Sequence, residues 1–367
     1  MKTSKKILFA SISIIMAAGM GLLFNACTIH PLAWQPKVKP TFTGELTLNE
    51  KLSTIQKIGL NSWYGPEDIV FDSLGNMYCG VHIGEKDFSD GRILKIDTSG
   101  KAEVFFSSNS WVAGLHFDNR GNLIALSHKL GLISINSDKT AILLANKDEK
   151  GRPFLIPNGL DIATDGKIYF SNTSHESAYN INYGRKIIME MRPTGGLHCY
   201  DPKNHEVKTL IEGTYFGNGV VLSKDESYIL MTETEKYRIL RYWLKGPQTG
   251  KTDIFMDNLP GFPNGISIRE DGSYWLGFST KRNDALDQIH PKPTLKKVVY
   301  ALPNFLQPKQ ELFGMILNIS QEGKVINALF DTTGTFTPET GAVKEHNGYL
   351  YIGGDVVPYI GKYKLNQ

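Results

Sequence analysis

The chain is poor in cysteine and has no strong excess of charge of either sign. Only 3 of its 367 residues are Cys, and 40 Lys and Arg residues stand against 37 Asp and Glu residues, for a formal net charge of +3. So few cysteines, with no CxxC pair, exclude a disulfide scaffold and provide no zinc motif. A charge balance this close to neutral gives no reason to expect nucleic acid as a partner.

An apolar run stands at the N-terminus. A basic start at residues 2–6 precedes the apolar stretch 7–24, and a small residue stands directly before Cys27. This pattern is typical of a signal peptide and resembles a bacterial lipobox. It predicts a signal peptide over 1–26, a lipid on Cys27, and a lipoprotein exported to the periplasmic or cell-surface side of a bacterial membrane. The alternative is an uncleaved anchor helix with an incidental Cys.

The rest of the chain divides into a spacer and one large domain. Residues 27–50 contain several prolines and are predicted to be a spacer, and residues 51–367 are predicted to form the folded domain. The two remaining cysteines, Cys79 and Cys199, lie in apolar stretches. We expect them to be buried free thiols, with a disulfide as the alternative.

One sequence pattern recurs six times in the domain. Each copy has a Gly or Pro, a polar or small residue, alternating apolar residues, a tight turn and a second alternating stretch, which is typical of strand hairpins. The copies are spaced at roughly the length of a four-stranded propeller blade. We therefore predict an all-β, six-bladed β-propeller, closed by an early strand near residues 52–60; six equivalent units argue against a β-sandwich. The copies begin with 65–71, 112–117, 156–162, 216–222, 262–268 and 339–343.

Two spacings between strands are long. Residues 173–194 and 279–313 form inserts, and the second has a helix-like stretch at 285–302 that contains prolines. Long loops in a compact domain are usually lids or binding elements, so we expect the two inserts to form a lid.

Oxygen-bearing side chains hold the same place in four repeats. In a propeller the first strand of each blade lines the central channel, so equivalent positions converge on the axis. One carboxylate and several amide oxygens suit Ca²⁺, and suit Mg²⁺ or Mn²⁺ less well. The alternatives are ordinary Asn-Gly turns, a purely structural ion or a water-filled channel. The four residues are Glu67, Asn158, Asn218 and Asn264, and the same place holds Gly114 and Gly341 in the other two repeats.

Several strings carry a family resemblance. The chain resembles the strictosidine synthase-like branch of the calcium-dependent propellers, which includes adipocyte plasma membrane-associated protein. The senescence marker protein/gluconolactonases and the paraoxonases are its cousins. The matching strings include Gly65-Pro66-Glu67, Gly91-Arg92-Ile93-Leu94, Tyr169-Phe170-Ser171-Asn172, Phe216-Gly217-Asn218-Gly219-Val220, Arg241-Tyr242-Trp243-Leu244-Lys245-Gly246-Pro247 and Leu259-Pro260-Gly261-Phe262-Pro263.

The resemblance implies a metal-dependent hydrolase of small lactones or aryl esters. It assigns Ca²⁺, or another divalent ion, to Glu67, Asn158, Asn218 and the Asn264 position, where the ion would polarise the scissile carbonyl for attack by water. The family usually has Asp at the position of Asn264, and that Asp is both a ligand and a general base. An amide cannot accept the proton. Strictosidine synthesis itself is not expected, because most chains of this branch do not share it.

Two functions remain open at this point. The first is the hydrolase, with His128 and His175 as candidate bases. The second is a non-catalytic lipoprotein, a ligand-binding or scaffold propeller that keeps a structural ion. Asn264 favours the second function, and the complete four-position ring favours the first.

Overall fold

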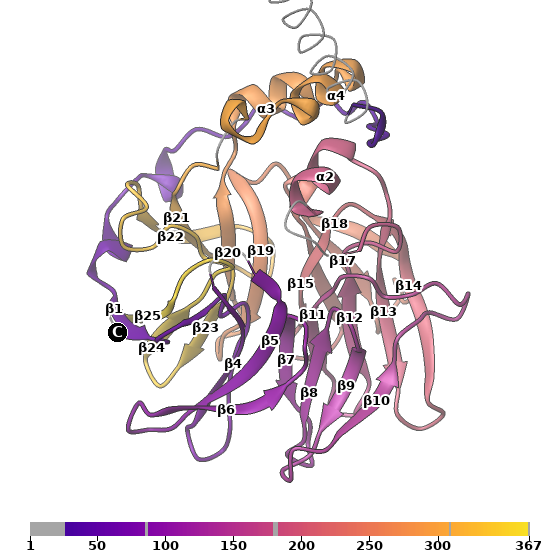
Figure 1. Cartoon of the computed structure of the whole chain (residues 1–367), viewed down its shortest axis with the longest axis vertical. Coiled ribbons are helices and arrows are strands. Elements are labelled where there is room, and N and C mark those ends of the chain that lie inside the picture. The colour runs from indigo at the N-terminus through magenta and orange to yellow at the C-terminus, as the bar shows by residue number, and fades with distance from the viewer. Residues whose placement is uncertain (1–25, 85–86, 179–182, 308–309, 366–367) are drawn as a thin grey trace, which may run out of the picture. The chain divides into compact units, whose positions relative to one another are not determined.

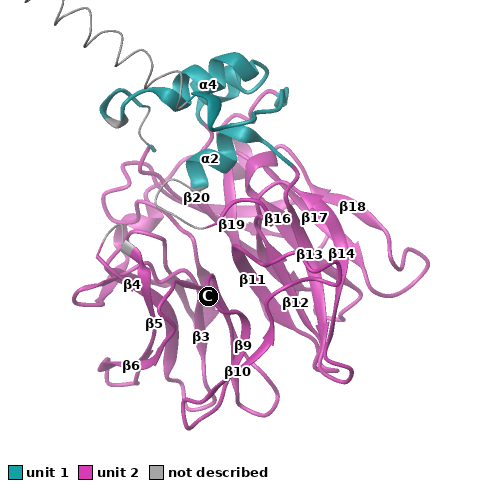
Figure 2. Cartoon of the chain, turned by 45° about the vertical axis from the view of Figure 1, so that its right-hand side comes forward, with its two compact units in different colours: residues 1–37, 184–192, 283–310 teal, residues 38–183, 193–282, 311–367 magenta. Residues whose placement is uncertain are grey.

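The computed structural model describes residues 26–84, 87–178, 183–307 and 310–365. The predicted signal peptide therefore lies outside the described residues, apart from Ala26. The chain forms two compact units, which Figure 2 colours separately. The insert unit comprises Met1–Lys37, Gly184–Arg192 and Asn283–Gln310, and the propeller unit comprises Val38–Tyr183, Pro193–Arg282 and Glu311–Gln367.

The propeller unit consists of six antiparallel sheets that follow one another along the chain (Figure 1). The predicted six-bladed β-propeller is confirmed. In blade one, β2 and β3 both pair with β4, and the other two strands continue the sheet outward. The strands of blades one to three are β2 (Trp63–Tyr64), β3 (Ile69–Phe71), β4 (Met77–Ile83), β5 (Asp87–Ile96) and β6 (Ala102–Ser107); β7 (Val112–Phe117), β8 (Leu123–Ser127), β9 (Gly131–Ile135) and β10 (Ala141–Ala145); and β11 (Pro157–Ile162), β12 (Ile168–Asn172), β13 (Gly195–Asp201) and β14 (Glu206–Thr214).

Blade six joins the two ends of the propeller. β1 (Gln56–Gly59) pairs with β25, with Gln56 opposite Lys362, so the early strand closes the last blade as predicted. This closure leaves no long open sheet edge at the junction. The strands of blades four to six are β15 (Gly217–Leu222), β16 (Tyr228–Glu233), β17 (Arg238–Trp243) and β18 (Thr252–Met256); β19 (Gly261–Ile268), β20 (Tyr274–Lys281), β21 (Gly314–Ile319) and β22 (Val325–Asp331); and β23 (Val343–His346), β24 (Tyr349–Ile352), β25 (Tyr359–Lys364) and β1.

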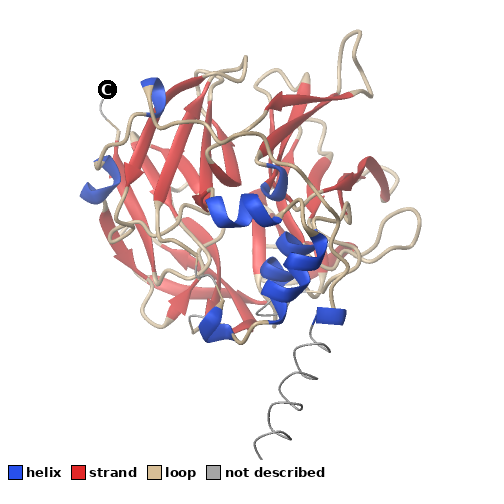
Figure 3. Cartoon of the chain, turned by 90° about the horizontal axis from the view of Figure 1, so that it is seen from above, coloured by secondary structure: helices blue, strands red, loops and turns tan. Residues whose placement is uncertain are grey.

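Apolar side chains fill the spaces between neighbouring blades. One cluster joins Val70 and Tyr78 of blade one to Val112 and Leu115 of blade two, and a similar cluster joins blades five and six around Trp275. Each sheet therefore buries both faces, because a blade on either side covers it. Strands account for most of the regular structure, and the helices are short (Figure 3).

The two remaining cysteines lie in these interfaces. Cys79 and Cys199 are buried and free, as expected. Burial raises the pKa of the Cys79 thiol to about 12 and that of Cys199 to about 11. Neither thiol is therefore ionised near neutral pH, and neither is reactive.

The predicted spacer is divided between the two units, with its residues up to Lys37 in the insert unit and those from Val38 in the propeller unit. Residues 38–54 lie along blade five, where the side chain of Asn49 donates to Ala328 O (3.0 Å) and accepts from Phe330 N (3.1 Å). This segment includes the short helices η1 (Gly44–Leu46) and η2 (Lys51–Thr54). Further along the chain, η3 (Thr234–Lys236) follows β16.

The insert unit brings both long inserts together. It contains α2 (Tyr183–Glu190), α3 (Asp284–Ile289), α4 (Pro293–Ala301) and η4 (Asn304–Leu306). The helix-like stretch at 285–302 is therefore two helices, because the prolines interrupt it. Arg185 of the first insert donates to Val299 O (3.1 Å) and Tyr300 O (2.9 Å) of the second. The lid role of the inserts stays a prediction. No helix among the described residues has the length and apolar content needed to cross a bilayer.

We predict that Gly80→Ala strongly destabilises the propeller. A Cβ at Gly80 would lie 2.0 Å from Val112 O of the next blade, so the two blades would have to separate. Overpacking of this kind costs roughly 3 kcal/mol. Gly59→Ala is the matched control, because a Cβ there meets nothing within 4 Å. Urea unfolding of the two variants tests this, and equal stabilities would contradict it.

Candidate functional site

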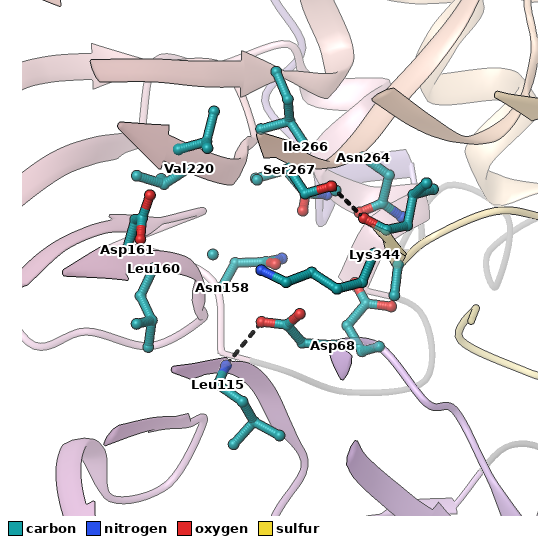
Figure 4. A pocket seen from close by; sticks show the side chains of 18 of the residues that line it. Asp68, Leu115, Asn158, Leu160, Asp161, Val220, Asn264, Ile266, Ser267 and Lys344 are labelled. Atoms are coloured by element: carbon teal, nitrogen blue, oxygen red, sulfur yellow. Dashed lines mark hydrogen bonds between the residues drawn. The ribbon is translucent and has the colours of Figure 1, made fainter. Parts of the chain in front are cut away.

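Four polar side chains from four blades meet on the propeller axis. Glu67, Asn158, Asn218 and Asn264 are 8%, 6%, 4% and 3% exposed, and all four line one cavity of about 100 Å³. Figure 4 labels Asn158 and Asn264. The structure thus brings together the four residues that the repeat pattern singled out. We call them the axial ring.

The inner strand of each blade is irregular where it carries a ring residue. The pairing of β11 with β12, of β15 with β16 and of β19 with β20 shifts register at each Asn-Gly pair. In blade one the inner strand is broken into β2 and β3 by Gly65-Pro66-Glu67-Asp68. Bulges of this kind redirect a side chain, and they are common next to functional sites.

Glycines let neighbouring inner strands approach each other at the axis. A Cβ at any of four glycines would collide with a backbone carbonyl oxygen of the neighbouring inner segment, so only Gly fits there. Gly341 also leaves space for the ring, since a Cβ there would lie 3.0 Å from Glu67 Oε2 and 3.4 Å from Asn264 Nδ2. The four contacts run from Gly114 to Asn158 O (2.3 Å), from Gly159 to Asn218 O (2.7 Å), from Gly219 to Asn264 O (2.7 Å) and from Gly265 to Gly341 O (2.4 Å).

Hydroxyl groups orient two of the ring amides. Asn218 Nδ2 donates to Thr234 Oγ1 (3.3 Å), and that hydroxyl donates to Pro263 O (2.7 Å). The hydrogen of this hydroxyl is used in the bond to Pro263 O, so the hydroxyl can only accept from Asn218. The Nδ2 end of the Asn218 amide therefore faces Thr234, and the Oδ1 end faces away from it. Asn264 Nδ2 is held in a similar way by Ser279 Oγ (3.0 Å).

Carboxyl groups that the sequence did not single out surround Glu67. Burial, followed by the neighbouring Asp355 and Glu339 carboxyls, raises the pKa of Glu67 well above its usual range. Burial and Asp355 likewise raise the pKa of Glu339 to about 8. Glu67 Oε2 and Asp355 Oδ1 are both buried without a hydrogen-bond partner among the residues that the structure describes. A site this rich in desolvated carboxyls favours either a bound proton or a bound cation.

One of these carboxyl residues, Glu339, lies in the sixth copy of the sequence repeat. Glu339 stands two residues before Gly341 in the weakest copy of the repeat, and its Oε1 accepts from Val356 N (2.8 Å). Asp355 lies in the loop between β24 and β25, outside the repeated pattern, so no periodicity marked it.

Charged side chains also line the cavity beside the ring. Asp68 accepts from Leu115 N (2.8 Å), and burial raises its pKa to about 6. Lys344 extends across the cavity between Asn158 and Asp68 (Figure 4). His116 also lies in the cavity wall, with Nε2 3.2 Å from Asp161 Oδ1.

The two candidate histidine bases lie elsewhere. His128 is half-buried and packs against Trp111 with ring centroids 5.6 Å apart, and the burial of its ring nitrogens lowers its pKa to about 3. His175 packs against His198, and burial lowers its pKa too. Neither His128 nor His175 belongs to the cavity wall, so the structure does not bring them to the ring.

The donor set fits a hard divalent cation only if amide oxygens take part. In the described parts of the chain, no three His, Cys, Asp or Glu side chains are placed to hold a metal ion by themselves. The ring supplies one carboxylate and three amides, all with oxygen atoms, which is the donor chemistry of Ca²⁺. The partnerless Glu67 Oε2 is the atom that a cation would satisfy.

Comparisons with known proteins agree with the family motifs. The model described as strictosidine synthase matches residues 158–247, and the one described as strictosidine synthase-like, N-terminal, matches residues 44–86. Adipocyte plasma membrane-associated protein from Bos taurus is 30% identical, with 98% of this chain and 89% of that protein covered. Protein STRICTOSIDINE SYNTHASE-LIKE 13 from Arabidopsis thaliana is 30% identical, with 74% of this chain and 73% of that protein covered.

Solved structures show the same fold. A gluconolactonase from Xanthomonas campestris matches with a TM-score of 0.61 at 14% identity, over 92% of this chain and 98% of that chain. The calcium-binding protein regucalcin from Agrobacterium tumefaciens matches with a TM-score of 0.55 at 13% identity, over 84% and 91%. At these identities the likeness establishes the propeller fold alone.

We expect the chelator-treated protein to lose stability as the pH rises from about 4.5 to about 8. Glu339 has an ordinary pKa of 4.5 and a folded-state pKa of about 8, so between these values the folded state binds more protons than the unfolded state. Glu339→Gln should flatten this slope, whereas Glu103→Gln, at an exposed position, should leave it unchanged. Unfolding curves at several pH values measure the slope, and identical slopes in all three proteins would refute the assignment.

Proposed function

This chain belongs to the strictosidine synthase-like family, and we propose that it is a divalent-metal-dependent hydrolase of lactones or aryl esters. The observation that carries the proposal is the axial ring, in which four buried oxygen-bearing side chains from four blades line one cavity. Three of the four ring residues stand at a register shift of the inner strand, a local irregularity that is common next to functional sites.

The ring residues would hold the ion. Glu67 supplies the charge, and Asn158, Asn218 and Asn264 supply amide oxygens. A bound Ca²⁺ would polarise the ester carbonyl and stabilise the negative charge that develops on its oxygen. The gluconolactonase from Xanthomonas campestris and the calcium-binding protein regucalcin from Agrobacterium tumefaciens have the same fold, which supports this choice of ion and substrate class.

The base is proposed to be Glu339. Asn264 cannot accept a proton, so the usual base of the family is missing. Glu339 is the next candidate because, although it is not itself part of the cavity wall, its carboxyl lies beside that of Glu67, which is, and has a pKa of about 8. It would take the proton from water as the water oxygen bonds to the carbonyl carbon, and return that proton to the leaving alkoxide when the ester C–O bond breaks.

A non-catalytic role is the alternative. The ring carries a single carboxylate, and the positively charged Lys344 side chain also lies in the cavity. Both features weaken ion binding, because a cation site gains affinity from negative charge. In this case the chain would be a binding or scaffold propeller whose ion only stabilises the fold.

We also propose that the chain is exported and attached to a membrane through a lipid on Cys27. Cys27 is exposed, and the animal relatives carry the name plasma membrane-associated. The intact mass of the purified protein tests this. A chain that starts at Cys27 with a diacylglycerol group supports the proposal, and an unprocessed N-terminus contradicts it.

Chelation should abolish hydrolysis of a lactone and aryl-ester panel, and Ca²⁺ should restore it. Glu67→Gln should lower the activity at least ~100-fold and remove the thermal stabilisation by Ca²⁺, because the only ring charge is lost. Glu103→Gln, at an exposed position, is the matched control. Ca²⁺-dependent stability without any hydrolysis would instead support the non-catalytic role, and no response to Ca²⁺ at all would exclude both proposals.

Asn264→Asp should tighten Ca²⁺ binding about tenfold, because it adds a second carboxylate to the ring. The same change should destabilise the chelator-treated protein, since the Asn264 amide lies near Glu67 Oε2 and two carboxylates would repel each other there. Asn204→Asp, in an exposed turn, controls for the change of charge. Calorimetric titration with Ca²⁺ measures the affinity, and equal or weaker binding would count against the ring as the ion site.

A further inference from the structure

The insert unit carries several large apolar side chains that are exposed to solvent. We propose that this surface docks onto a lipid bilayer, as a second membrane contact beyond the N-terminal attachment. The docking patch consists of Leu295 and Val298 on α4, Phe305 and Leu306 on η4, and Leu32 in the N-terminal segment. The inference does not depend on the proposed hydrolase activity.

The side chains of the docking patch are large, apolar and exposed. Phe305 is 80% exposed, Leu306 57%, Val298 53%, Leu32 47% and Leu295 37%. All five belong to the insert unit, which is coloured teal in Figure 2. Single exposed apolar residues are ordinary, but several on adjoining short elements indicate an interaction surface.

The polarity of α4 is reversed relative to an ordinary surface helix. Lys296 is fully buried, and its Nζ donates to Leu32 O (2.8 Å). Leu295 and Val298, which are three residues apart and share a face, point outward instead. A helix that faced water would turn its lysine out and its leucine in. The outer face of α4 is therefore suited to an apolar environment.

Basic groups accompany the apolar ones. Lys292 and Lys297 are on or next to α4 and accessible to solvent, and the helix sequence from Pro293 to Ala301 contains no acidic residue. An apolar face beside lysines is the chemistry of a segment that lies in the interface of an anionic bilayer, with the apolar side chains among the acyl chains.

The course of the chain indicates why the occupant is a bilayer rather than a protein. The apolar stretch 7–24 and Cys27 precede the segment 28–37, and this segment belongs to the insert unit, where Leu32 N donates to Glu190 O (2.8 Å). The proposed attachment, whether a lipid on Cys27 or an anchor helix, would directly precede this segment, and the inference rests on that proposal. The membrane is thus held close to the patch, and the second contact forms at high effective concentration.

The test measures the depth of single spin labels on the full-length protein in phosphatidylcholine–phosphatidylglycerol vesicles. Labels are placed on Val298→Cys and Phe305→Cys, with Ile142→Cys on β10 as the control at an exposed apolar site (51%) of the propeller unit. Cys79 and Cys199 are buried, and labelled unsubstituted protein corrects for Cys27. Relaxation by oxygen, which concentrates in the bilayer, is compared with relaxation by a water-soluble nickel complex.

We expect oxygen to relax the labels at 298 and 305 more strongly than nickel does, and the order to be reversed at 142. Nickel access at 298 and 305 equal to that at 142 would show that the patch faces water and would overturn the proposal. Shielding of both labels from oxygen and nickel would show that protein covers the patch, and this would also overturn it. Because these residues are exposed, the substitutions should not disturb folding, which circular dichroism checks. Quenching of Phe305→Trp fluorescence by brominated lipid provides a second, label-free readout.

Discussion

The close approach of backbone to backbone at the propeller axis is the constraint on which the rest of the structure depends. Glycines of the inner strands face backbone carbonyl oxygens of the neighbouring inner segment at separations that exclude a Cβ, as at Gly114 and Gly265. This contact sets the diameter of the channel, because a bulkier residue would force the blades apart. The side chains at the neighbouring bulges point towards the axis, where they line the cavity. The fold and the candidate site are therefore consequences of the same contacts.

Electrostatics then determine what the axis can do. Four blades deliver oxygen atoms, and blade six adds Glu339 with Asp355 close behind, so several carboxyls share a region from which water is largely excluded. Such a cluster is stable only when protons or a cation neutralise it. A basic group lies nearby, since Lys344 reaches across the cavity beside Asp68.

The insert unit is built differently from the propeller unit. It is assembled from three separate stretches of chain, which are joined by hydrogen bonds such as those from the Arg185 side chain to the carbonyl oxygens of residues 299 and 300. A fully buried Lys296 at its centre and leucine and valine on its outside reverse the usual arrangement. We infer that its surface, like the axial ring, reflects a function rather than the needs of folding alone. The two units thus carry the two proposed sites, the ion site on the axis and the membrane-docking patch.

The sequence alone determined the number of blades, the closing strand and the four ring positions. These features repeat, and periodic alternation of apolar residues and turn residues is encoded locally. The tertiary structure decided the rest. It showed that each ring residue sits at a bulge or break, that Glu339 and Asp355 join Glu67, and that His128 and His175 stay outside the cavity wall. It also divided the helix-like stretch of the second insert at its prolines and joined the two inserts. No local pattern could provide these facts, because each depends on which side chains approach one another from positions far apart in the chain, and on how much water remains between them.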